Sequence, residues 1–290
     1  MKKALLICIL ATICLFYIPT SAQKVKEPTS GPPEWSQSYV PFRIVGNVYY
    51  VGTYDLACYL IVTPQGNILI NTGLAASAQT IKENIETLGF KFNDVKILLT
   101  TQAHYDHVGA MSAIKKQTGA MMMVNEKDAG VLTDGGSSDY ELGKNGSTYE
   151  PVKVDRLLKN GDKITYGGMD ITMLHHPGHT KGSSSFLFDV REEDKKYNVL
   201  IVNMPSIVTD RKLSAIPLYP DIAKDYAYTF ASMKKLSFDI WLSSHASQFG
   251  LHSKHKPGAV YSPTAFIDRP GYDKEVSELE AAFRKKMEER

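Results

Sequence analysis

Residues 98–111 read LLTTQAHYDHVGAM and place four side chains that can bind a metal within six positions. These side chains are Gln102, His104, Asp106 and His107, in the pattern Q-x-H-x-D-H. Zinc in proteins takes imidazole nitrogen and carboxylate oxygen, and a catalytic zinc site leaves one position for water. The pattern therefore predicts hydrolytic metal chemistry, with an amide at the position where a third imidazole would be expected.

Two distant histidines occupy similar places, each just after an apolar run. His179 follows MDITML and His245 follows FDIWL, as the pair His104 and His107 follows KILLTT. Strand ends in layered folds converge on one rim, so we expect these side chains to meet there. Side chains from one tight turn point in different directions, which suits two zinc ions a few Å apart better than one.

The other four histidines have different surroundings. His252 and His255 belong to the lysine-rich stretch LHSKHKPG, which predicts a solvated loop. His175 and His176 begin HHPGHT, and one of them is placed to support a ligand from behind. We therefore do not assign any of the four as a metal ligand.

The elements around these residues predict an α+β protein. Expected strands cover 42–52, 57–63, 67–71, 96–101, 120–124, 162–176 (two strands joined by a Gly-Gly turn), 183–190, 197–204 and 238–244. Expected helices cover 75–90, 108–119, 221–236 and 273–290, and a surface loop is expected at 133–151. Strands open each half of the chain and helices close it. This order predicts two sheets packed face to face with helices outside, a four-layer αβ/βα sandwich.

The beginning of the chain predicts export. Lys2 and Lys3 precede the apolar run ALLICILATICLFYI, and small residues follow before Gln23. This layout is typical of a signal peptide over residues 1–22, and the run is short for a membrane span. We therefore expect a periplasmic protein with a single domain at 23–290.

The composition of the remaining chain excludes several kinds of partner. The two signal lysines account for the whole formal charge of +2, so the mature chain is neutral. A neutral chain gives no reason to expect nucleic-acid or membrane-surface binding. Cys58 is its only cysteine and has apolar neighbours, which predicts a buried, inert thiol. We expect a monomer that acts on small molecules.

The segments QAHYDHVG, HHPGHTKGS and SSHAS, in this order and spacing, resemble the metallo-β-lactamase superfamily. More narrowly, they resemble class B β-lactamases of the third subclass and their glutamine-variant, GOB-like members, over essentially the whole mature chain. The resemblance implies the same αβ/βα sandwich. It also implies antibiotic resistance through hydrolysis of the β-lactam ring amide by a metal-bound hydroxide.

The resemblance also implies roles for particular residues. One zinc would be held by Gln102, His104 and His179, and the other by Asp106, His107 and His245. The second zinc is expected to bind more tightly, because its ligands carry a negative charge. Asp106 would also orient the nucleophile, and Ser206 would bind the substrate carboxylate. The chain departs from the usual pattern at Asn71, where an aspartate is common, and at Met204, where the subclass commonly has serine.

Three other functions remain as alternatives. Thioesterases and lactonases of the superfamily place a bridging aspartate after the strand that here reads YNVLIVNMPSIVT, and this chain has no acid between Asp194 and Asp210. A serine β-lactamase would need K-T-G or S-D-N beside its S-x-x-K motif, and neither occurs. A non-catalytic zinc protein would use closed sites with four protein ligands. The residues therefore favour the lactamase interpretation.

Overall fold

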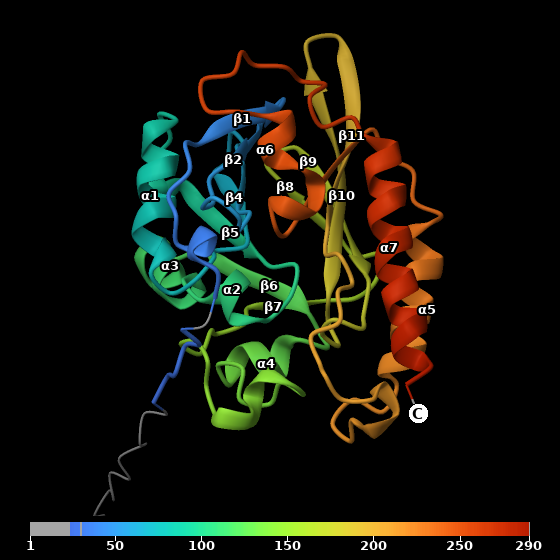
Figure 1. Cartoon of the computed structure of the whole chain (residues 1–290). Helices are drawn as coiled ribbons and strands as arrows, with labels where there is room; N and C mark the ends of the chain where they lie inside the picture. Colours follow the sequence, from blue (N-terminus) through green and yellow to red (C-terminus); the bar gives the residue numbers. More distant parts are fainter. Residues whose placement is uncertain (1–23, 30, 290) are drawn as a thin grey trace, which may run out of the picture.

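The apolar runs pair into two sheets that face each other across the centre of the molecule (Figure 1). The computed structural model of the chain describes residues 24–29 and 31–289, so the predicted signal peptide at 1–22 lies outside the described residues. In the described ranges, no helix is both long and apolar enough to cross a membrane.

The first sheet has seven strands that lie in the order of the chain. They are β1 (Phe42–Val45), β2 (Val48–Tyr50), β3 (Tyr59–Ile61), β4 (Asn67–Ile70), β5 (Val95–Leu99), β6 (Met121–Asn125) and β7 (Arg156–Leu158). Strands β1 to β4 pair antiparallel, whereas β4, β5, β6 and β7 run parallel. The carboxyl ends of β4 and β5 therefore meet at the same edge of the sheet.

The second sheet has five strands in the order β12-β11-β10-β9-β8. They are β8 (Lys163–Tyr166), β9 (Met169–His175), β10 (Ser184–Glu192), β11 (Lys195–Val202) and β12 (Ile240–Ser243). Strand β10 pairs antiparallel with both β9 and β11, and β11 pairs parallel with β12. Strands β9, β11 and β12 therefore run in the same direction. Their carboxyl ends therefore also share one edge.

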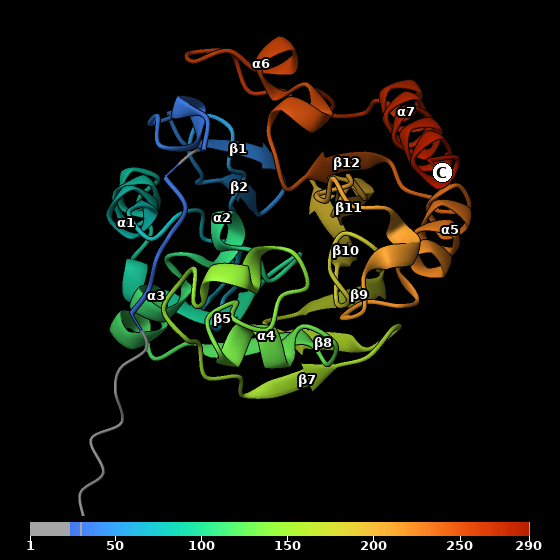
Figure 2. The same cartoon turned by 60° about the horizontal axis from the view of Figure 1, so that its bottom comes forward.

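Alternating side chains along the strands divide the core into layers. In β4, Ile68 and Ile70 pack between the two sheets, while Leu69 points outward under the helices, as the twofold period of a strand requires. The helices on that outer face are α1 (Ser77–Thr87) and α3 (Met111–Thr118). Both stand beside the first sheet in Figure 2.

Helices α5 (Ile222–Met233) and α7 (Arg269–Met287) cover the second sheet on the opposite side (Figure 2). The order of layers is thus helix, sheet, sheet, helix, and the predicted αβ/βα sandwich is confirmed. Three short helices lie in connections: α2 (Tyr105–Val108), α4 (Ala129–Thr133) and α6 (Leu251–Lys254).

The structure corrects two local expectations. The helix expected at 108–119 is present as α3 but begins at Met111, because a break of two residues separates it from α2. At the break, a Cβ on Gly109 would lie 2.5 Å from the backbone nitrogen of Ala75, so only glycine permits this close approach. The solvated loop predicted around His252 and His255 is also wrong. Their rings stack on the aromatic rings of Tyr54 and Phe42 with centroids 3.8 Å and 3.6 Å apart, because aromatic packing outweighs the charged neighbours.

Candidate metal centre

The candidate ligands gather where strands of both sheets end. Gln102 to His107 follow β5 of the first sheet, whereas His179 follows β9 and His245 follows β12 of the second. An antiparallel bridge between Leu56 and His245 ties the two sheets together at this edge. The six residues fall into two groups, which we call the glutamine cluster (Gln102, His104, His179) and the aspartate cluster (Asp106, His107, His245).

The aspartate cluster offers three ligand atoms that lie within 4.8 Å of one another. Oδ2 of Asp106 lies 3.0 Å from Nε2 of His107 and 3.4 Å from Nε2 of His245. Asp106 and His107 are adjacent in α2 and buried, and the side chain of His245 is 17% exposed. One carboxylate oxygen and two imidazole nitrogens thus face a common point, as zinc requires.

His107 lacks the hydrogen bonds that a buried imidazole needs. Its Nε2 lies close to Asp106, but the geometry is not that of a hydrogen bond. Both ring nitrogens are left without a hydrogen-bond partner among the described residues. A buried polar atom without a partner is costly. A metal ion beside Nε2 would supply the missing interaction, so these residues fit a zinc site.

The glutamine cluster fits a zinc ion for a different reason. Nε2 of His104 lies 3.2 Å from Oδ2 of Asp139, and Nδ1 of His179 donates to the backbone oxygen of Ser206 over 2.8 Å. The remaining nitrogens, Nδ1 of His104 and Nε2 of His179, face each other at 3.2 Å. Two neutral imidazoles with these tautomers would point lone pairs at one another, and either a metal ion between them or a proton on His104 would relieve this repulsion.

The spacing of these two nitrogens agrees with zinc. Two imidazole ligands of a tetrahedral zinc, each about 2.0–2.1 Å from the metal, lie about 3.3 Å apart. Gln102 adds a side-chain oxygen, Oε1, which is buried and has no hydrogen-bond partner among the described residues. An amide oxygen in this state is available as a ligand.

Electrostatic surroundings differ between the histidines. Burial lowers the pKa of His245, but Asp106 and Asp55 outweigh it and raise that pKa to about 9. Burial, reinforced by the neighbouring His104, lowers the pKa of His179 to about 3. Burial opposes ionisation of Asp106, yet contact with His107 and His245 holds its pKa well below the usual value. Asp106 is therefore a carboxylate at neutral pH.

Asp128 holds the loops of the glutamine cluster together, and sequence analysis did not identify it. Its carboxylate accepts the N–H of Ala103 at 3.1 Å, the hydroxyl of Thr180 at 2.7 Å and the N–H of Gly182 at 2.7 Å. A Cβ on Gly182 would lie 2.5 Å from Asp128, so glycine is required there. This buried carboxylate fixes the segment before His104 against the segment after His179.

Asn71 supports the same region from β4. It adopts φ +63°, a left-handed conformation that asparagine tolerates better than most residues. Its Oδ1 accepts the N–H of Thr101 at 2.9 Å and the hydroxyls of Thr100 and Thr101 at 3.2 Å each. Asn71 thus accepts these bonds without bringing the charge that an aspartate would add beneath Gln102.

Ser206 and Met204 lie after β11 and have separate surroundings. The hydroxyl of Ser206 is partly exposed and lies 3.2 Å from Nδ1 of His179, while its backbone oxygen also accepts the hydroxyl of Tyr226 at 2.9 Å. Met204 is 1% exposed and belongs to the core between the sheets. Only Ser206 is placed to meet a ligand at the cluster.

The remaining singled-out residues lie outside both clusters. Nε2 of His175 lies 2.8 Å from the backbone oxygen of Lys181, and Nδ1 of His176 lies 2.7 Å from the hydroxyl of Ser185. Cys58 is buried, as expected, and burial raises the pKa of its thiol. None of the three belongs to the metal centre.

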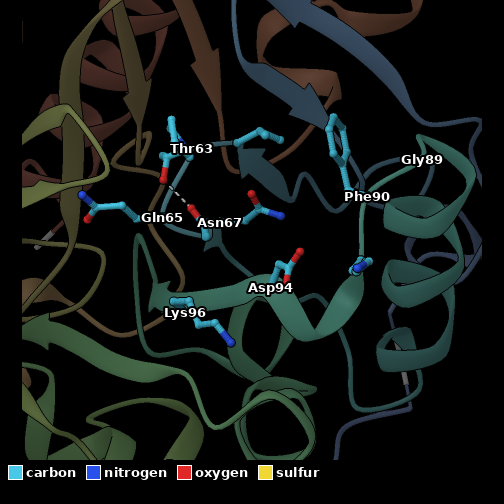
Figure 3. A pocket seen from close by; sticks show the side chains of 11 residues that line it. Thr63, Gln65, Asn67, Gly89, Phe90, Asp94 and Lys96 are labelled. Carbon is cyan, nitrogen blue, oxygen red and sulfur yellow. Dashed lines mark hydrogen bonds between the residues drawn. The ribbon is translucent and has the colours of Figure 1, made fainter.

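A surface pocket of about 360 Å³ lies at the opposite ends of β4 and β5 (Figure 3). It is lined by residues of the β3–β4 turn, such as Thr63 and Asn67, and of the segment before β5, such as Asp94 and Lys96. The Lys96 amine donates to the backbone oxygen of Asn93 at 2.7 Å. The described residues lining this pocket include no candidate ligand, so it is separate from the metal centre.

Comparison with known proteins indicates the family of the chain. The family model described as "Metallo-beta-lactamase superfamily" matches residues 52–192. An uncharacterized protein of Mycobacterium tuberculosis is 33% identical over 93 residues, which cover 31% of this chain and 42% of that protein. The chain thus spans less than half the length of the first curated relatives that it matches.

Two solved structures match over nearly their full length. The class B3 di-zinc metallo-β-lactamase LRA-12 from an Alaskan soil metagenome is 61% identical, with a TM-score of 0.89, and the match covers 91% of this chain and 100% of that one. The metallo-β-lactamase GOB-18 from Elizabethkingia meningoseptica is 57% identical, with a TM-score of 0.91, over 92% and 99% of the two chains. Identity of this extent on the same fold shows that the chain belongs to the metallo-β-lactamase superfamily, in its class B3 group.

Proposed function

We propose that this protein is a zinc-dependent β-lactamase that hydrolyses the amide of the β-lactam ring. The observation that carries the proposal is the pair of clusters in which Oε1 of Gln102 and the ring nitrogens of His107 have no hydrogen-bond partner among the described residues, on a chain 61% identical to a class B3 enzyme over that enzyme's full length. β-Lactam antibiotics are the proposed substrates, and resistance to them is the proposed consequence.

The two clusters would each hold one zinc ion, with up to two per chain. His104 and His179 turn one ring nitrogen each towards a common point, and Gln102 adds an oxygen that has no hydrogen-bond partner in the part of the chain that the structure describes. Bound zinc lowers the pKa of a coordinated water to about 7 and polarises a carbonyl oxygen. Each cluster has three protein ligands, which is the number found in catalytic zinc sites rather than closed structural ones.

The chain's own residues then orient the reactants. Asp106 stays ionised, so its carboxylate can accept a hydrogen bond from the attacking water and align it. Ser206, with a partly exposed hydroxyl beside His179, would donate to the carboxylate that β-lactams carry. Asp139 keeps His104 oriented, and its own pKa is lowered to about 2, because the contact with His104 and backbone N–H groups outweighs burial.

The thioesterase and lactonase alternative receives no support from β11. Asn203 follows this strand, is buried, and has its Oδ1 3.4 Å from the hydroxyl of Ser244. An amide at this place cannot supply the negative charge of a metal-bridging aspartate. β-Lactam hydrolysis therefore fits the site better.

We also propose how the protein is organised in the cell. The signal features of residues 1–22 favour export to the periplasm, and residues 23–290 would then form one domain. The equal numbers of acidic and basic side chains in the mature chain argue against nucleic-acid or membrane-surface partners. We propose that the mature enzyme acts as a monomer on small-molecule substrates.

The test is hydrolysis of the chromogenic cephalosporin nitrocefin by the zinc-loaded protein. A chelator should abolish the activity and added zinc should restore it, because neither cluster can act without its metal. A His245→Ala variant serves as the matched inactive control. Activity that persists in the metal-free protein, or hydrolysis of thioesters with none of nitrocefin, would refute the proposal.

A further inference from the structure

Asp55 lies directly behind a candidate zinc ligand, although it is 190 residues away in the chain. Its Oδ2 lies 3.0 Å from Nδ1 of His245 and accepts the indole N–H of Trp35 at 3.2 Å. Its Oδ1 accepts the backbone N–H of Ser247 at 2.9 Å. This one carboxylate therefore contacts the imidazole of His245, the indole N–H of Trp35 and the backbone N–H of Ser247.

The backbone fixes Asp55 in this place from both sides. Its carbonyl accepts the N–H of Ala246 at 2.7 Å, and its own N–H donates to the carbonyl of Glu34 at 3.2 Å. The next residue, Leu56, forms the antiparallel bridge with His245. Asp55 precedes β3 of the first sheet and His245 follows β12 of the second, so the contact joins the two sheets.

Trp35 completes the environment of His245. The two rings lie 5.6 Å apart between centroids with an interplanar angle of 43°, and the indole N–H is held by Asp55. Trp35 packs against one side of the imidazole, and Asp55 holds its Nδ1 edge. The ring of His245 therefore has little freedom to turn.

We propose that Asp55 is a positioning residue that accepts the Nδ1–H of His245, aims Nε2 at Asp106, and so strengthens zinc binding by the aspartate cluster. The inference rests on the proposed function, because it assumes that this cluster holds zinc. A carboxylate behind a metal-binding imidazole fixes its tautomer and raises its basicity. Such outer partners typically contribute about 10- to 100-fold to metal affinity.

Asp139 provides a matched comparison for Asp55. It stands behind His104 at 3.2 Å, but it also accepts two N–H groups of its own loop, from Glu141 at 2.9 Å and Leu142 at 2.7 Å. Asp139 thus belongs to the glutamine cluster and Asp55 to the aspartate cluster. Substitution of either residue should affect only its own cluster.

The experiment measures zinc affinity at a single site. In a Gln102→Ala/His179→Ala background, where the glutamine cluster keeps one ligand only, a competing chromophoric chelator reports binding by the aspartate cluster. Adding Asp55→Asn should weaken zinc binding about tenfold, and Asp55→Ala should weaken it by up to about 100-fold. Asparagine keeps one acceptor oxygen but loses the charge, and its amide would face the N–H of Ser247.

Two controls separate positioning from general damage. Asp139→Asn in the same background should leave the affinity unchanged, and Trp35→Phe, which keeps an aromatic ring but loses the donor to Asp55, should have a smaller effect than Asp55→Asn. Thermal unfolding checks that each variant is folded. The readout is metal affinity rather than β-lactam turnover, so failure of the proposed β-lactamase activity would not be mistaken for failure of this inference.

NMR of the zinc-loaded protein without the Asp55 substitution tests the same inference independently of variant folding. Nitrogen-15 shifts of His245 should show Nε2 bound to metal and Nδ1 protonated, with the Nδ1–H proton shifted downfield by its carboxylate partner. Coordination through Nδ1 would overturn the proposal. It would also be overturned if folded Asp55→Asn bound zinc as tightly as its background, or if Asp139→Asn weakened the same site equally.

Discussion

The glutamine cluster and the aspartate cluster lie at the same edge of the molecule but differ in charge. The aspartate cluster contains the ionised Asp106, whereas the glutamine cluster has no carboxylate among its candidate ligands. Amide oxygen is a poorer partner for zinc than imidazole nitrogen, since zinc is a borderline-soft ion. We therefore expect the glutamine to make the occupancy of a second metal conditional on zinc supply.

The residues behind the histidines do not extend this difference. Asp139 lies behind His104 in the glutamine cluster, as Asp55 lies behind His245 in the aspartate cluster. Each cluster therefore has a supporting carboxylate, and the charge contrast comes from the candidate ligands themselves, because Asp106 is ionised and Gln102 is neutral. This contrast favours filling of the aspartate cluster first.

Removal of ligands from the aspartate cluster should have the largest effect. His245→Ala and Asp106→Ala should each lower kcat/KM for nitrocefin at least about 100-fold, because each removes a ligand of the same zinc. The double variant should be no worse than the poorer single one, since the two changes destroy one site. His255→Ala, which removes an imidazole outside both clusters, is the control. If the losses in kcat/KM of the two single variants multiply in the double variant, or if the double variant is active, the two residues do not bind the same zinc.

Replacement of the glutamine should reduce the difference in affinity between the clusters. Stepwise zinc titration of the metal-free protein, followed by native mass spectrometry, should show two unequal affinities, with the aspartate cluster filled first. Gln102→His should strengthen the weaker step by about tenfold or more, which corresponds to about 1.4 kcal/mol, because imidazole replaces an amide. Equal steps in both proteins, or earlier filling of the glutamine cluster, would contradict the comparison.

Ser206→Ala tests whether substrate binding can be separated from zinc binding by the glutamine cluster. KM for β-lactams should rise several-fold while kcat changes less, as expected for loss of uniform binding. Zinc content should stay the same, because the backbone oxygen that holds His179 remains. Met204→Ala should instead lower stability by about 2–5 kcal/mol through the cavity it leaves. An unchanged KM in the serine variant would place the substrate carboxylate elsewhere.

The two histidines within each cluster should bind protons differently in the metal-free protein. Burial lowers the pKa of His107 and of His179, whereas for His245 and His104 neighbouring carboxylates outweigh burial and raise the pKa. His245, with a pKa raised to about 9, is protonated at neutral pH, while His179, with a pKa lowered to about 3, is neutral. His245 therefore stabilises the fold below its unfolded pKa of about 6.5 and loses this contribution as pH rises towards 9. His179 stabilises the fold above about 6.5 and loses this contribution as pH falls towards 3.

NMR titration of the histidine rings checks this contrast. Of the four predictions, this one has the smallest expected effect. Zinc binding by the aspartate cluster should release about one proton from His245 near pH 7, because a metal-bound imidazole must lose its proton. The same titration should find His179 unprotonated throughout the neutral range. Similar pKa values for the His245 and His179 rings would contradict this prediction.

Much of the architecture was predictable because it depends on local patterns. The short apolar run in NILIN predicts the strand β4, and the helical period of 75–90 predicts α1. The expected surface loop at 133–151 contains a residue of the candidate metal centre, however, that the sequence did not indicate. Asp139 is 5% exposed and lies behind His104, and a Gly- and Ser-rich loop gives no local sign of that burial.

The sequence by itself determined the ligand types, their places after apolar strands, and the family that the spacing of histidines indicates. Only the tertiary structure decided which ring nitrogen each histidine turns towards a metal. That choice depends on the partner of the other nitrogen, such as Asp55 for His245 or Ser206 for His179. These partners come from segments far apart in the chain, and no local pattern encodes a contact that exists only after the two sheets have packed together.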